Sequence, residues 1–184
     1  GVGWYPGKAF LSTSYSYDHP RYGIPVDPEE PDEVRVLNMR RHNIRATGGF
    51  HDLNSFLTGF RASFNYNDYQ HQEIPNGVIG TVFKNKTYLY DGMVEQKKTG
   101  RWSGSFGYWG MHRDYSATGE EVLTPPTLQN AVAAFALETF DLRKIILQFG
   151  GRVEHNGFAP EGQPDRSFNG ASAAAGVRIS LWEG

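Results

Sequence analysis

With 184 residues, the chain has the length of one domain, and it combines a low hydrophobic content of 39% with 14% aromatic residues. This mixture is poor for a helical core and favours strands with one apolar and one polar face. A net charge of -2 offers no basic surface for nucleic acid, and the lack of cysteine excludes disulfides and thiolate chemistry. No apolar run approaches the roughly 20 residues of a membrane-spanning helix, whereas β-strands cross with about 9–11 alternating residues.

Eight segments are predicted to be strands, because most of them alternate apolar and polar residues with period two. The clearest alternation begins at Phe56, where Phe60 and Phe64 share one face and Arg61 and Asn65 share the other. In chain order the expected strands lie near Lys8–Tyr17, Arg41–Phe50, Phe56–Asn67, Thr81–Gln96, Trp102–Tyr108, Leu128–Thr139, Ile145–Glu154 and Asn169–Leu181. The fold class is therefore all-β.

Two of these segments are less clear. In the fourth, Tyr88 and Tyr90 alternate with Leu89, so the apolar face is ambiguous. The sixth is rich in Ala and could be a helix, but the two prolines before it and a tight turn after it favour a strand. In the last two strands, Leu147, Phe149, Val177 and Ile179 are expected opposite Arg152 and Arg178.

The links between the expected strands alternate between short and long. The short links are His51–Ser55, Lys97–Arg101 and Phe140–Lys144, and the long ones are Asp18–Glu33, Gln70–Gly80, Ser116–Leu128 and His155–Ser167. Strands that run up and down would place all the short turns at one rim and all the long loops at the other. This asymmetry is typical of an antiparallel up-and-down transmembrane β-barrel of the bacterial outer membrane.

Aromatic residues gather towards the strand ends, as in the girdles of a membrane barrel. Tyr15 and Tyr17 precede the first long link, and Tyr66 and Tyr69 precede the second. A soluble antiparallel barrel or sandwich would also alternate. Soluble strands, however, usually turn Lys and Glu outward, whereas here the charged residues share the face of Gly, Ser and Asn, and this favours the membrane interpretation.

Several segments resemble the TonB-dependent outer-membrane receptors, in the branch that includes zinc receptors. The most similar stretch is Trp109–Glu121, which continues to Pro125-Pro126-Thr127 and contains RDYSATGEE followed by PPT. Four further similarities follow the order of the family: Tyr22–Pro25, Tyr69–Ile74, Thr81–Lys86 and Phe149–Glu154. Together these segments span most of the chain.

The resemblance implies a barrel of about 22 strands around an N-terminal plug that carries the TonB box. Residues 1–184 are then about eight strands of a larger barrel, a partial barrel domain without the plug, and both ends are expected to be internal to a longer chain. The implied partners are outer-membrane lipid, the rest of the same barrel with its plug, and TonB through the plug. The implied location is the outer membrane of a Gram-negative bacterium.

The histidines are candidates for metal capture. His19, His71, His112 and His155 are each expected at a strand end that enters a long loop, and each has a carboxylate nearby. Imidazole with carboxylate suits Zn, Cu or Ni. The proposed metal site is His71 and His112, completed by Glu73, Glu120 or Glu121. The alternative is that these side chains face water or hold the loops by hydrogen bonds.

No catalytic residue is predicted, because no nucleophile elbow or phosphate-binding loop is present, and no cofactor is expected. Arginines such as Arg61 and Arg152 fall on the polar face. They could hold the carboxylates of a plug or an anionic ligand. We favour the alternative that they pair with carboxylates of the barrel wall.

The predicted function is therefore part of a receptor that imports a scarce nutrient: a metal ion, a metal complex such as a siderophore or cobalamin, or a sugar. Zinc or a metal complex would be cargo, and the barrel would perform no bond chemistry. The alternative is a complete small eight-stranded outer-membrane barrel with an adhesion or structural role. A soluble ligand-binding barrel is a weaker third possibility.

Overall fold

The computed structural model describes residues 1–25, 32–119 and 122–180. In these residues it contains strands and no helix, and hence no helix that could span a membrane. The strands are β1 (Val2–Trp4), β2 (Ala9–Asp18), β3 (Arg21–Gly23), β4 (Arg35–Phe50), β5 (Leu57–Pro75), β6 (Thr81–Thr99), β7 (Trp102–Thr118), β8 (Thr127–Asp141), β9 (Ile145–Pro160) and β10 (Arg166–Ile179). The eight expected strands are present, and β1 and β3 are short additions.

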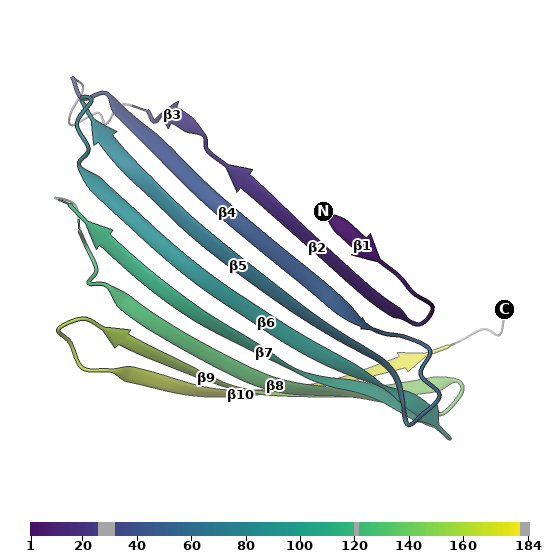
Figure 1. Ribbon diagram of the computed structural model, residues 1–184. Coiled ribbons are helices and arrows are strands. Elements are labelled where there is room, and N and C mark those ends of the chain that lie inside the picture. The colour runs from purple at the N-terminus through teal and green to yellow at the C-terminus, as the bar shows by residue number, and fades with distance from the viewer. Residues whose placement is uncertain (26–31, 120–121, 181–184) are drawn as a thin grey trace.

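All ten strands form one antiparallel sheet in which consecutive long strands are neighbours (Figure 1). The order is β1-β2-β4-β5-β6-β7-β8-β9-β10. The short strand β3 pairs with β4, on the same edge of β4 as β2. This confirms the predicted up-and-down topology. Among the described residues β10 pairs only with β9, so the sheet is open and is not the closed eight-stranded barrel of the alternative. The Ala-rich segment is strand β8, as its flanking turns predicted.

For two of the four links that were predicted to be long, the prediction is wrong, because the structure has short turns there. Only residues 76–80 separate β5 from β6, and only 161–165 separate β9 from β10. The strands continue pairing into these segments, for example Gln72 with Val82 and Asn169 with His155. Backbone hydrogen bonds do not require an apolar face, so an antiparallel pair can extend past the point where the alternation of the sequence fades. The links 19–34 and 119–126 are long, as expected.

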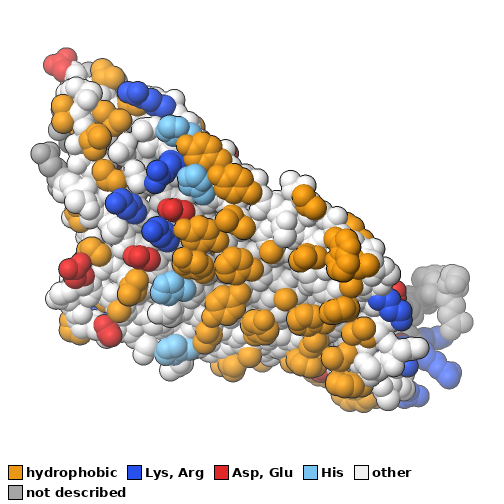
Figure 2. All heavy atoms as spheres, in the orientation of Figure 1, with side chains coloured by type: hydrophobic (Ala, Val, Ile, Leu, Met, Phe, Trp, Pro, Cys, Tyr) orange, Lys and Arg blue, Asp and Glu red, His pale blue; other side chains and the backbone are white. Residues whose placement is uncertain are grey.

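The cross-strand register separates the side chains onto two faces. Directly paired residues of an antiparallel ladder share a face, so one cross-strand row runs Phe50, Phe60, Val94, Phe106, Ala136, Gly151 and Ala173. Phe64, Leu147, Phe149, Val177 and Ile179 lie on this same face, which we call the apolar face. Figure 2 shows it as a broad hydrophobic band. Phe56 was also expected there, but it precedes β5.

The opposite face, which we call the polar face, carries Arg61, Asn65, Arg152 and Arg178, as the alternation predicted. The register also resolves the ambiguous fourth strand. Tyr88 and Tyr90 pair with Tyr66 and Phe64 on the apolar face, and Leu89 therefore belongs to the polar face.

The sheet is one layer thick and has almost no core of its own. Among the described residues the buried apolar side chains are few: Ile74, Ala117, Ala131 and Ala133. Phe60 is 36% exposed and Val177 is 65% exposed. A soluble domain buries its apolar face against a second layer. The described sheet has none, so its apolar face has no partner within the described residues, as on the outer wall of a membrane barrel.

Placing a charge at Phe60 tests this assignment. Phe60→Arg should cost about 2–4 kcal/mol of folding free energy in a bilayer, because the guanidinium would enter hydrocarbon. The measurement is urea unfolding of the whole parent protein in lipid vesicles. Ser63→Arg is the matched control, since Ser63 is on the polar face opposite Asp91, and it should change stability by less than about 1 kcal/mol. Equal losses for the two variants would contradict the assignment.

Candidate ligand-binding site on the polar face

The polar face carries an aromatic and cationic cluster at the end of the sheet where the links 19–34, 76–80 and 119–126 lie. Two neighbouring cross-strand rows build it. One runs Arg41, Tyr69, Asn85 and Tyr115 over β4 to β7, and the next runs Met39, His71, Phe83 and Ala117. With Arg113, these residues are called the rim cluster. Three of its members are aromatic and two are guanidinium groups, a set suited to planar, anionic or metal-chelating ligands.

His71 is at the centre of the rim cluster. Its ring stacks on Phe83 with centroids 4.4 Å apart and an interplanar angle of 21°. The Tyr69 hydroxyl lies 3.0 Å from His71 Nδ1, and the other ring nitrogen, Nε2, lies 3.9 Å from Glu73 Oε1. The side chain is 21% exposed. These contacts hold the imidazole in one orientation and leave it partly open on the polar face.

His71 is five residues past Tyr66, in the part of β5 that continues beyond the apolar band to Pro75. Burial there lowers the pKa of His71, and the neighbouring Glu73 carboxylate opposes the shift. Because burial is the larger effect, the imidazole is neutral at pH 7. A neutral ring can accept the Tyr69 hydroxyl proton at Nδ1 and donate from Nε2, so it is a hydrogen-bonding group.

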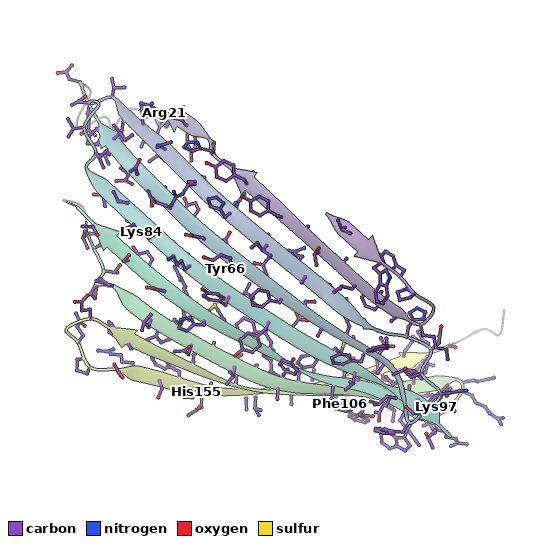
Figure 3. The ribbon with its side chains drawn as sticks, in the orientation of Figure 1. Arg21, Tyr66, Lys84, Lys97, Phe106 and His155 are labelled. Carbon is purple, nitrogen blue, oxygen red and sulfur yellow. The ribbon has the colours of Figure 1, made fainter. Side chains whose placement is uncertain are left out.

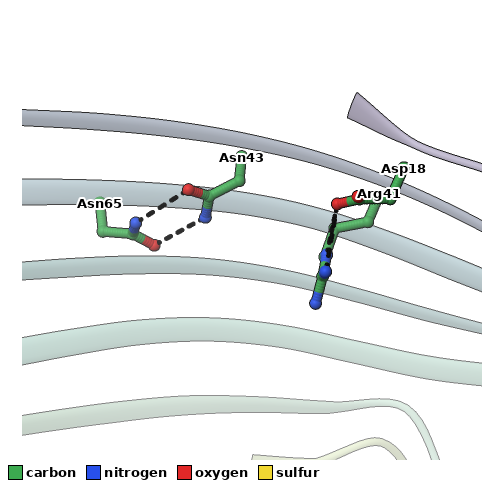
Figure 4. Close-up of polar contacts among 4 residues, drawn as sticks. All are labelled: Asp18, Arg41, Asn43 and Asn65. Carbon is green, nitrogen blue, oxygen red and sulfur yellow. Dashed lines mark hydrogen bonds and ion pairs between the residues drawn. The ribbon is translucent and has the colours of Figure 1, made fainter. Parts of the chain in front are cut away.

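The two guanidinium groups of the rim cluster are held differently. Arg41 donates from Nε and Nη2 to Asp18 Oδ2 at 3.2 and 3.1 Å (Figure 4). Arg113 donates from Nε to Asn85 Oδ1 at 3.0 Å and lies over the Tyr115 ring, 5.4 Å from its centroid. Arg41 is thus neutralised by a carboxylate, whereas the contacts that Arg113 makes with described residues are to neutral groups.

The middle of the polar face is a polar wall with a shallow hollow of about 440 Å³. Arg61, Asp91, Trp109 and Arg152 are among its lining residues. Arg152 donates to Glu154 Oε2 at 3.1 Å and lies 5.9 Å from the Trp109 ring centroid. The pairing of wall charges that the sequence favoured is therefore found for Arg152.

The wall also contains a reciprocal amide pair. Asn43 Nδ2 donates to Asn65 Oδ1 at 3.2 Å, and Asn65 Nδ2 donates back to Asn43 Oδ1 at 3.3 Å (Figure 4). This contact joins β4 to β5 directly below the rim cluster and satisfies both half-buried amides.

The structure does not bring the predicted metal ligands together. His112 pairs with Tyr88, which pairs with Tyr66 on the apolar face, whereas His71 is on the polar face. The predicted convergence of these two histidines is wrong, because strand neighbours share an ion only from one face of the sheet. Glu73 remains beside His71, but Glu120 and Glu121 lie outside the described residues. In the described part of the chain, no three His, Asp or Glu side chains are arranged to hold a metal.

Of the predicted rim histidines, His19 directly follows the end of β2 as expected, but two others are placed differently. His112 and His155 lie within β7 and β9, several residues before the strand ends, on the apolar face (Figure 3 labels His155). Each is hydrogen-bonded to an asparagine, His112 to Asn130 and His155 to Asn169, both at 2.7 Å. In Figure 2 the histidines lie where the hydrophobic band gives way to charged side chains. They are therefore boundary residues of the apolar face.

Sequence reasoning missed most of the rim cluster. Tyr69 was counted among the aromatic residues of a membrane girdle, although its parity puts it on the face of Asn65 and Arg61. Phe83 is in the ambiguous fourth strand, and only its pairing with His71 places it on this face. Counting by two from Arg61 reaches Tyr69 and His71 without a break. The signal was available, but the strand was expected to end before these residues.

Comparison with known proteins supports the fold. No family model matches the chain, and no curated protein matches its sequence. Among solved structures it is similar to the iron transporter FrpB of Neisseria meningitidis, with a TM-score of 0.77, 12% identity, and coverage of 98% of this chain and 32% of that one. It is also similar to the alcaligin outer-membrane receptor FauA of Bordetella pertussis, with a TM-score of 0.69, 14% identity, and coverage of 97% and 31%.

A third similar structure is the ferric preacinetobactin receptor BauA of Acinetobacter baumannii, with a TM-score of 0.67, 11% identity, and coverage of 98% and 36%. The chain thus spans about a third of the length of these proteins. At such low identity the likeness concerns the fold: an antiparallel up-and-down sheet like part of a receptor β-barrel. The zinc branch of the sequence resemblance finds no support among these structures.

The amide pair of the wall yields a stability test. Asn43→Ala should cost about 1–2 kcal/mol, because two hydrogen bonds are lost and the Asn65 amide loses its partner. Urea unfolding of the whole parent protein measures the cost, and the double variant Asn43→Ala/Asn65→Ala should recover part of it. Strictly additive losses would show that the two amides are not coupled.

Proposed function

We propose that the chain is part of the outer-membrane β-barrel of a TonB-dependent receptor, and that its rim cluster contributes to the binding of a metal complex before import. The observation that carries the proposal is the aromatic and cationic rim cluster on the polar face, at the same end of the sheet as the long links. In a barrel whose apolar face meets lipid, the polar face lines the lumen. The rim cluster would then line the entrance from outside the cell.

The chemistry of the rim cluster favours a ferric complex over a bare ion. A siderophore complex carries planar chelating groups and negative charge, which match stacked aromatic rings and the available Arg113 guanidinium. The three similar structures are an iron transporter, an alcaligin receptor and a ferric preacinetobactin receptor, and this supports a ferric complex as the cargo. A bare zinc ion would need several ligands, and among the described residues of this rim only His71 and Glu73 are close together.

In this proposal the barrel segment performs no bond chemistry. Its partners are the remainder of the same barrel, the plug, TonB through the plug, and outer-membrane lipid on the apolar face. The location is the outer membrane of a Gram-negative bacterium. Transport energy would come from TonB acting on the plug, so the contribution of these residues is to bind the ligand and to form the wall.

Two histidines on opposite faces provide the test. In the full-length receptor, His71→Ala should weaken binding of its ferric complex about tenfold, because a stacked ring and a hydrogen-bond partner are lost, worth about 1.4 kcal/mol together. His112→Ala is the matched control and should leave the affinity unchanged, since His112 is on the apolar face. The measurement is quenching of intrinsic fluorescence by a panel of ferric hydroxamate and ferric catecholate complexes.

Calorimetry with Zn²⁺ and titration with cyanocobalamin on the same three proteins extend this panel. Tight zinc binding that is lost in His71→Ala would replace the ferric complex with a metal ion as cargo. No binding of any ferric complex by the wild-type receptor, or equal affinities in all three proteins, would contradict the proposed role of the rim cluster.

A further inference from the structure

Positive charge is concentrated at the end of the sheet where the short turns lie. The cations there are Lys97 and Lys98 in the last residues of β6, Arg101 in the turn that follows, and Arg143 and Lys144 in the turn after β8. The carboxylate of Asp141, the last residue of β8, lies between the two groups. The opposite end differs in sign. In the sequence, the links 19–34, 119–126 and 161–165 contain nine carboxylates and one arginine. The sheet is therefore charged oppositely at its two rims.

The register brings the two cationic turns side by side. β7 and β8 are paired, and the Asp141 amide donates to the Arg101 carbonyl oxygen at 2.8 Å. Lys98 Nζ lies 2.6 Å from Asp141 Oδ2, so the Asp141 carboxylate forms an ion pair with Lys98. We call Lys97, Lys98, Arg101, Arg143 and Lys144 the turn patch.

The turn patch is accessible. All five side chains are exposed, and Figure 3 labels Lys97 at this end of the sheet. Lys97, Arg101 and Arg143 form no ion pair with another described residue. Glu138 lies near the patch, but Gln96 Nε2 donates to both of its carboxylate oxygens at 2.5 and 2.6 Å. Lys97, Arg101 and Arg143 are thus the exposed cations left for an external anion.

The position of the patch relative to the apolar face indicates what that anion is. Trp102 and Phe140 are cross-strand partners at the turn end of β7 and β8, and their rings contact with centroids 4.7 Å apart. Aromatic residues at the edge of an apolar face mark the level of the lipid headgroups. Arg101 is one residue beyond this level, Arg143 lies in the turn after β8, and Lys97 is near the end of β6, two residues before Thr99, the partner of Trp102. Exposed Lys and Arg side chains at this level reach the phosphates with their charged ends.

We propose that the turn patch binds anionic phospholipid headgroups in the leaflet at the short-turn rim. This inference rests on the proposed function only in that the apolar face lies in a membrane; it does not depend on the cargo. The recognised group is a phosphodiester with net negative charge, as in phosphatidylglycerol. A zwitterionic headgroup gains less from the patch, because its own amine competes for the phosphate.

The test uses the full-length receptor in nanodiscs of phosphatidylcholine mixed with phosphatidylglycerol. Native mass spectrometry counts the lipids of each kind that remain bound on release. The wild type should retain phosphatidylglycerol in excess of its share in the nanodisc. The variant Lys97→Gln/Arg101→Gln/Arg143→Gln should lose that excess, with phosphatidylglycerol binding lowered about tenfold or more.

The matched control removes the same charge at the opposite end. Arg21→Gln/Arg40→Gln/Lys84→Gln changes three exposed cations there and should keep the excess of phosphatidylglycerol. If the turn-patch variant keeps its excess of phosphatidylglycerol, the proposal is overturned. An equal loss of that excess in the control also overturns it, because lipid retention would then depend only on the overall charge of the protein. Ferric-complex binding is measured on the same proteins, so a failure of the proposed cargo is distinguished from a failure of the lipid site.

Discussion

The backbone ladder of a single antiparallel sheet is the constraint on which the rest of this molecule depends. The described sheet has no second layer, so the position of every side chain is set by which residue it pairs with across the strands. A shift of one residue would exchange the two faces. Phe60 and Val94 would then enter water, and Arg61 and Arg152 would enter lipid. The contrast between the two faces therefore stabilises one register, and interruptions at Leu57/Gly59 and Gln96/Thr99 confine its irregularities to the short-turn end.

The same ladder gives one wall two unrelated surfaces. On the apolar face the rows pass from phenylalanine and valine to tyrosine, histidine and asparagine, which fits a change from hydrocarbon to headgroups. On the polar face, cross-strand rows bring Tyr69, His71 and Phe83 into contact although β5 and β6 are separate segments. Because alternate residues point to opposite faces, a strand can hold a lipid contact and a ligand contact at adjacent positions without conflict.

The two ends of the sheet differ in the charges that their links carry. Carboxylates dominate the long links, and cations dominate the short turns beside Trp102 and Phe140. On the apolar face, the Glu138 carboxylate accepts hydrogen bonds from the Gln96 amide. In the rim cluster Arg41 is paired with Asp18, whereas Arg113 contacts the neutral groups of Asn85 and Tyr115 among the described residues. The proposed ligand site and the proposed lipid site therefore use different groups of cations, and each group can be altered without the other.

The sequence by itself determined the strand content, the up-and-down order and the two faces, because period-two alternation is a local property of each strand. It also identified His71 and Glu73 as residues of interest. It could not determine that β5 and β9 continue past their apolar alternation, since pairing there depends on a partner strand. For that reason His71 and His112 were expected at one rim and predicted to converge. Only the tertiary structure, through the register of β5 to β7, placed them on opposite faces and assembled the rim cluster from strands distant in the chain.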